Sequence, residues 1–297
     1  QQMDAEINLI LNEEWIDIDK LRQISINRGL SSANARRLVW PLFLNVSLND
    51  AEVSKKTQQN TAEDVAPTMK TRTQIHIDAI RSFNELNFYP PLQQRMREDI
   101  EKLENKIFGN QQRIYYFQGY DDICVIFMLI FGEKNALPLL ERISTTFHLH
   151  NHESSFTTLI KHLNFLFPLI SLYNLPLFRL LEETGVASDF AVSAMISWFA
   201  HDFSQPPYRL AQRVFDFVIA SQEPLAPLYI VAAMMLQKES FEKFFQIQQG
   251  EFSADFSQTH QILRKMITKQ PHTPELMISD YPNKSNSWSD AQVSLGR

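Results

Sequence analysis

Apolar residues recur along most of this chain at intervals of three and four, the spacing that places side chains on one face of an α-helix. Between residues 3 and 28, for example, the pattern includes Ile7, Ile10 and Leu21. Strand-type alternation is nearly absent, and only 7 glycines are available for tight turns in 297 residues. The sequence therefore predicts an all-α fold.

Helix-breaking and capping residues divide this pattern into segments. We expect helices at 3–28, 35–44, 71–86, 92–107, 121–132, 156–173, 175–183, 187–203, 210–221, 227–237 and 257–269. The polar stretch 47–71 predicts a mobile surface loop. A further break near residues 148–155 predicts two packed helical subdomains, spanning residues 1–155 and 156–297.

Composition excludes several classes of protein. A net charge of -6 argues against nucleic acid as a partner, and the single Cys124 excludes a CxxC metal or redox site and fits a cytosol-facing protein. The longest apolar runs, 123–131 and 225–236, are shorter than the roughly 18 residues of a membrane span. We expect both runs to be buried core helices, and no membrane span within the chain.

Three short motifs occur in a fixed order in the first half of the chain. They are Arg-Arg-Leu-Val-Trp-Pro at 36–41, Ile-His-Ile-Asp-Ala-Ile-Arg at 75–81 and Tyr-Phe-Gln-Gly-Tyr-Asp-Asp at 116–122. In this order they resemble the signature of the TBC domain family: Arg-x-x-x-Trp, Ile-x-x-Asp-x-x-Arg and Tyr-x-Gln-Gly-x-x-Asp. Each pattern alone is weak, but the ordered combination is specific. The similarity covers roughly residues 15–280, and segments 193–203 and 213–217 are most similar to the member twenty branch of this family.

The resemblance implies a GTPase-activating protein for a Rab-family small GTPase. Arg81 then corresponds to an arginine finger and Gln118 to a glutamine finger, and both enter the partner's GTP site in trans. The chain would act as an activator rather than as an independent hydrolase. It has no P-loop pattern of its own, so it should need no cofactor, and the GTP and Mg²⁺ belong to the Rab.

The branch adds a finer expectation about partner and location. It implies action on the Rab of ER-to-Golgi traffic, the Rab one type. It also implies a C-terminal membrane helix, which these 297 residues do not contain, and therefore a cytosol-facing position at the ER membrane.

The residues themselves support the chemistry of the fingers. Asp78 and Arg81 are i, i+3 neighbours on one helix face, so we expect the carboxylate to orient the guanidinium. A guanidinium is suited to the charge that develops on a transferring phosphoryl group. Gly119 lets the turn after Gln118 approach another protein closely. A simple surface ion pair, and a glutamine that caps the next helix, remain alternatives.

The other matched residues have expected supporting roles. Asp78 and Tyr116 would position the fingers, and Asp122 would hold the turn through backbone hydrogen bonds. Arg36 and Trp40 would pack and tether this region.

Two rival functions come from other classes of protein. One is a non-catalytic TBC-shaped scaffold, which would need neither finger. The other is a small-molecule hydrolase that uses Asp121 and Asp122, but adjacent helical residues point about 100° apart. A zinc site formed by His148, His150 and His152 is disfavoured, because the HExxH spacing is missing.

Overall fold

The computed structural model describes residues 2–48, 67–110 except 85 and 87, 114–148, 155–205, 208–237, 260–261 and 263–264. Within these ranges the regular elements are helices, and no strand occurs, as the sequence predicts. The α-helices are α1 (Gln2–Leu11), α2 (Ile18–Asn27), α3 (Ala33–Leu44), α5 (Met69–Arg81), α6 (Pro90–Asn110), α7 (Tyr120–Thr146), α8 (Thr157–Leu163), α9 (Leu166–Tyr173), α10 (Leu175–Thr184), α11 (Val192–Ser197), α12 (Arg209–Ser221) and α13 (Ala226–Leu236). A short 3-10 helix, η2 (Ser188–Ala191), precedes α11.

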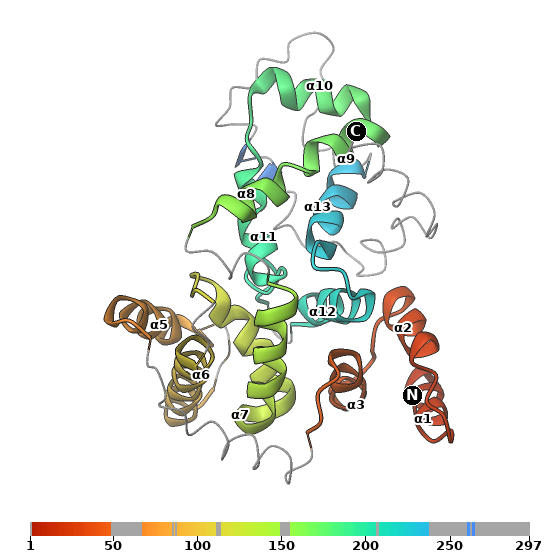
Figure 1. Cartoon of the computed structure of the whole chain (residues 1–297), viewed down its shortest axis with the longest axis vertical. Helices are drawn as coiled ribbons and strands as arrows, with labels where there is room; N and C mark the ends of the chain where they lie inside the picture. Colours follow the sequence, from red (N-terminus) through yellow and green to blue (C-terminus); the bar gives the residue numbers. More distant parts are fainter. Residues whose placement is uncertain are drawn as a thin grey trace.

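Helix α7 lies at the centre of the part that positions the site. It packs against α3, α5, α6 and α11 (Figure 1). Helices α8, α9, α10 and α13 form the upper part of the molecule in this view, whereas α12 packs on α2 and α3 as well as on α13. The expected boundary at residue 155 therefore stays a prediction, and α12 joins the two sequence halves.

Several predicted helices are interrupted. The expected helix 3–28 is two helices, because Asp17 accepts a 2.9 Å hydrogen bond from the Lys20 amide and caps a new start at α2. The expected helix 156–173 breaks between α8 and α9, and the helix that begins at Met69 ends at Arg81 rather than at residue 86. The segment 49–66, expected to be a loop, lies outside the described residues, as does most of the helix expected at 257–269.

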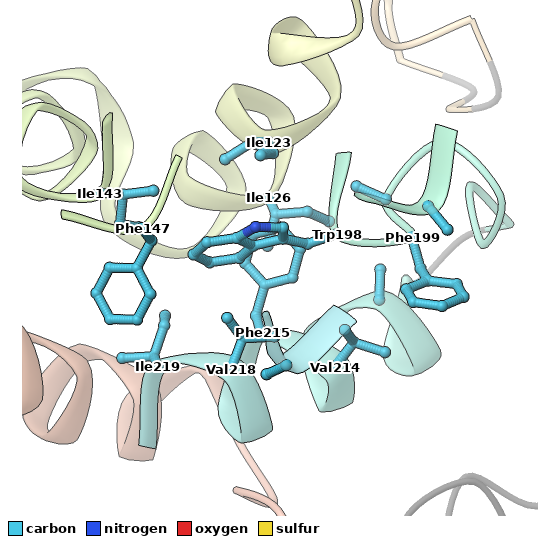
Figure 2. Packing of buried hydrophobic residues seen from close by; sticks show 14 of the residues in the cluster. Ile123, Ile126, Ile143, Phe147, Trp198, Phe199, Val214, Phe215, Val218 and Ile219 are labelled. Atoms are coloured by element: carbon cyan, nitrogen blue, oxygen red, sulfur yellow. The ribbon is translucent and has the colours of Figure 1, made fainter. Parts of the chain in front are cut away.

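The helix expected over 187–203 ends early, at Ser197. Trp198 and Phe199 adopt left-handed backbone conformations, with φ of 51° and 64°, which stop the helix. Figure 2 shows the reason: the Trp198 indole lies between Ile123 and Ile126 of α7 and Phe215 of α12. Burial of this ring, which is 1% exposed, offsets the cost of the backbone conformation.

Gly132 divides α7 at the position where the sequence predicts a helix end. Its φ of 71° and ψ of 170° are not helical, and a second helical segment follows directly. Among the described helices, α7 is the one long and apolar enough to cross a membrane by length and composition. Most of its apolar window is buried inside the protein, as expected for a core helix.

A buried carboxylate links the first motif to the second half of the chain. Asp216 of α12 is fully buried and accepts hydrogen bonds from the amide of Leu30 at 2.8 Å and from Trp40 Nε1 at 2.9 Å. Arg36 donates to both of its oxygens, at 3.0 and 2.8 Å. Arg36 and Trp40 thus tether α3 to α12, and Trp40 also packs on the ring of Phe127.

Candidate partner-binding groove

Arg81 and Gln118 line the same groove, which has a volume of about 640 Å³. One wall comes from the end of α5 and the turn before α7, and the other from η2, α11 and the turn after it. Two residues distant in sequence therefore share one open surface, as the TBC resemblance requires.

Arg81 is the last residue of α5, and its side chain is exposed. The helix is held in place from its other face, where Ile75 and Ala79 are buried. Ser82 then turns the chain into an extended conformation. Within the described residues, the guanidinium makes no hydrogen bond or ion pair, so it is available to a partner.

Gln118 is exposed in the turn that precedes α7. The next residue, Gly119, has a φ of 97°, a conformation that strongly favours glycine. A Cβ added there would lie 3.7 Å from Ile196, so conformation rather than space requires the glycine. Gly119 is itself the N-cap of α7 and no side chain caps this helix end, which argues against a capping role for Gln118.

Asp78 does not bond Arg81, contrary to the expectation from their i, i+3 spacing. Its carboxylate is buried and accepts hydrogen bonds from Gln74 Nε2, at 3.0 Å to each oxygen, and from the Tyr116 hydroxyl at 2.8 Å. The difference arises because Gln74 and Tyr116 engage the Asp78 carboxylate, whereas the Arg81 side chain is exposed in the groove. Asp78 therefore connects the two segments that carry Arg81 and Gln118.

Ser82 and Asp121 form a second connection, which the sequence did not reveal. The Ser82 hydroxyl donates a 3.1 Å hydrogen bond to Asp121 Oδ2. Burial, with the nearby charges of Asp122 and Asp78, raises the pKa of Asp121 to about 7. Since Ser82 follows Arg81 and Asp121 lies three residues after Gln118, this bond joins the segments that carry Arg81 and Gln118. The sequence signals were that Ser82 directly follows the second motif and that Asp121 lies within the third.

Asp122 also has a partner other than the one expected. Asp122 Oδ2 lies 3.0 Å from Nδ1 of His201, which belongs to the other wall of the groove. The sequence had predicted hydrogen bonds from backbone amides of the same turn instead. Asp121 and Asp122 thus bond different elements, which argues against a paired acid-base role for them.

The histidine cluster has no support as a metal site. His148 is buried, with its ring beside Tyr120 and Trp198. His150 and His152 lie outside the described residues. Across the described ranges, no three His, Cys, Asp or Glu side chains are arranged to hold a metal ion.

Comparisons with known proteins agree with the motifs. The profile of the Rab-GTPase-TBC domain family matches residues 33–244. TBC1 domain family member 20 of Bos taurus is 32% identical over 280 residues, which are 93% of this chain and 64% of that protein. GTPase-activating protein gyp10 of Schizosaccharomyces pombe is 28% identical over 244 residues, 81% of this chain and 62% of the relative. The chain thus spans just under two thirds of these relatives.

Solved structures show the same fold. The Ypt/Rab-GAP domain of Gyp1p aligns with a TM-score of 0.69 at 16% identity, covering 100% of this chain and 99% of that one. The Chlamydomonas flagellar RabGAP TBC domain aligns with a TM-score of 0.61 at 15% identity, covering 94% and 91%. The family profile, which matches more than half of the chain, confirms the resemblance in the three motifs. This chain belongs to the Rab-GTPase-TBC domain family.

Proposed function

We propose that this chain is a GTPase-activating protein for a Rab-family GTPase and that it supplies Arg81 and Gln118 to the partner's active site. The observation that supports this most is the shared groove: both side chains are exposed and line it together. Neither is engaged elsewhere in the described structure, although the backbones that carry them are fixed by hydrogen bonds.

The groups present suit phosphoryl transfer to water. Water attacks the γ-phosphorus, the bond from this phosphorus to the β–γ bridging oxygen breaks, and the electron pair leaves with GDP. The Arg81 guanidinium would stabilise the negative charge on the bridging and γ-oxygens. The Gln118 carboxamide would orient the attacking water. The partner binds GTP and Mg²⁺, and no covalent intermediate forms on this chain.

The partner that we favour is the Rab of ER-to-Golgi traffic, the Rab one type. Support comes from the similarity to TBC1 domain family member 20, at 32% identity over 93% of this chain, and from the matching segments at 193–203 and 213–217. The same similarity supports a cytosol-facing site of action at the ER membrane.

Single-turnover GTP hydrolysis over a panel of purified Rabs tests the proposal. We expect the parent chain to accelerate hydrolysis by one or a few Rabs, by roughly 10³- to 10⁵-fold. Arg81→Ala and Gln118→Ala should each remove most of this acceleration while the fold is retained. Arg95→Ala is a matched control, because Arg95 is an exposed arginine on α6 outside the groove. A scaffold would bind a Rab without accelerating hydrolysis at all.

A further inference from the structure

His201 lies in the turn after α11, in the wall of the groove opposite Arg81 and Gln118. The turn follows α11, and its neighbouring residues Trp198, Phe199 and Phe203 are almost completely buried. The rings of Phe199 and Phe203 stack with centroids 5.3 Å apart. The His201 amide donates a 3.2 Å hydrogen bond to Ser197 Oγ, so this bond and the core contacts of its neighbours hold the backbone of residue 201.

From this turn the imidazole contacts the segment that bears Gln118. His201 Nδ1 lies 3.0 Å from Asp122 Oδ2, and residue 122 is in the first turn of α7, three residues after Gly119. The side chain of Asp122 is 23% exposed and that of His201 is 60% exposed, so water screens this pair in part. Among the described residues, Asp122 makes no other side-chain hydrogen bond.

We propose that His201 is a positioning residue for the GTPase-activating reaction. It binds Asp122, and through Asp122 it fixes the start of α7 and the turn that presents Gln118 relative to the second wall of the groove. This inference rests on the proposed function, and it adds a residue outside the three motifs.

The charges around His201 favour its protonated form. Asp122 and Asp121 face it from α7, Asp202 lies beside it on the same turn, and Arg264 lines the groove nearby. The hydrogen bond and charge of Asp122, opposed by burial, raise the pKa of His201 to about 9. The imidazolium is therefore the main form near neutral pH, and it donates Nδ1–H to the carboxylate.

The direct test compares His201→Gln with a matched control. His76→Gln removes a similar pair, His76 Nδ1 to Glu101 Oε2 at 2.9 Å, which joins α5 to α6 outside the groove. In single-turnover assays near pH 7 we expect His201→Gln to lower the hydrolysis rate at saturating GTPase-activating protein roughly tenfold, because small displacements of catalytic groups are costly. His76→Gln should leave this rate within about twofold of the parent.

The pH profile separates positioning by the ion pair from a general structural effect. The ratio of parent to His201→Gln rates should shrink as the pH rises through about 9, where the imidazole loses its proton. Equal rates for the parent and His201→Gln near pH 7 would overturn the proposal. So would a ratio that stays constant across this pH range.

An NMR titration distinguishes failure of the ion pair from failure of the proposed function. In the free protein, we expect the His201 ring signals to titrate near pH 9, and the midpoint to fall toward that of an ordinary histidine in Asp122→Asn. A midpoint near 6.5 in the parent would disprove the pair itself. If the midpoint is high but the parent activates no Rab, the proposed function fails and the positioning role fails with it.

Discussion

The Tyr116 hydroxyl donates a 2.8 Å hydrogen bond to Asp78 Oδ2. Tyr116 lies two residues before Gln118, and Asp78 lies three residues before Arg81, so this one bond joins the two segments that carry Arg81 and Gln118. The bond from Ser82 to Asp121 joins the same two segments at positions after Arg81 and Gln118. The relative position of Arg81 and Gln118 therefore depends on polar contacts between side chains that are their neighbours in the sequence.

Tyr116→Phe tests the first of these bonds. The change removes a hydroxyl and keeps the ring, whose edge contact with Phe108 has a centroid distance of 5.1 Å. We expect a loss of about 1 kcal/mol in the free energy of unfolding. We also expect a loss of roughly tenfold in the rate of stimulated GTP hydrolysis, because both finger segments lose a constraint. Chemical denaturation and single-turnover assays measure the two effects. Unchanged hydrolysis with the expected loss of stability would show that the bond has only a structural role.

Asp121→Asn tests how the charge of the buried Asp121 carboxylate affects stability. The folded-state pKa of Asp121, about 7, is above the ordinary value of 3.8, so the folded protein holds this proton more tightly than the unfolded chain. The contribution of the Asp121 carboxyl to the free energy of unfolding is therefore fully present below about pH 4, and it is lost as the pH rises through 7. Asparagine carries no charge and can still accept from Ser82. The variant should therefore match the parent near pH 4 and exceed it in melting temperature near pH 8, by roughly 2–4 °C for each kcal/mol gained. A gain that is the same at both pH values would contradict this account.

Asp216→Ala tests the tether between α3 and α12. The substitution leaves the buried guanidinium of Arg36 without its carboxylate, and removal of one partner of a buried pair costs about 3–5 kcal/mol. The control is Arg28→Ala, which breaks the exposed pair with Glu6 at 2.7 Å and should cost less than about 1 kcal/mol. Urea denaturation of both variants measures the difference. Similar losses in the two variants would mean that the hydrogen bonds of Asp216 stabilise the fold no more than an exposed ion pair does.

Gly29→Ala tests a close approach between α2 and α12. A Cβ at Gly29 would lie 2.5 Å from Arg213 Cδ, and the glycine has a φ of 75°. Gly185 has a similar φ of 65° but nothing within 4 Å, so Gly185→Ala measures the cost of the conformation alone. We expect about 1 kcal/mol for Gly185→Ala and a clearly larger loss for Gly29→Ala, because Arg213 must move and give up its bonds to the carbonyls of Ser25 and Ile26. Equal losses in thermal denaturation would contradict the predicted clash.

The sequence predicted the fold class and the main helices because apolar periodicity is a local signal. The prediction from sequence failed where contacts between distant residues determine the backbone conformation. At Trp198, the left-handed conformation follows from burial of the indole against α7 and α12. The prediction also placed one helix over residues 3–28, because periodicity continues across the cap that Asp17 provides.

For the site, the motifs identified Arg81 and Gln118, which line the groove, but not the bonds between the segments that carry them. The spacing of Asp78 and Arg81 suggested a pair, whereas the structure pairs Asp78 with Tyr116, 38 residues away. His201 lies in the segment 193–203 that carries the branch resemblance, but the sequence did not indicate its contact with Asp122, which is 79 residues distant. Local patterns report helical faces, and contacts between helices require the fold.

The most direct measurement of the central claim is the affinity of this protein for a Rab loaded with GDP, with and without aluminium fluoride. The fluoride complex imitates the transferring phosphoryl group, so a protein that inserts Arg81 and Gln118 should bind it at least ~10²-fold more tightly than the GDP form. Arg81→Ala should abolish this difference. Equal affinity of the parent for both forms, or a difference that survives in Arg81→Ala, would contradict the account.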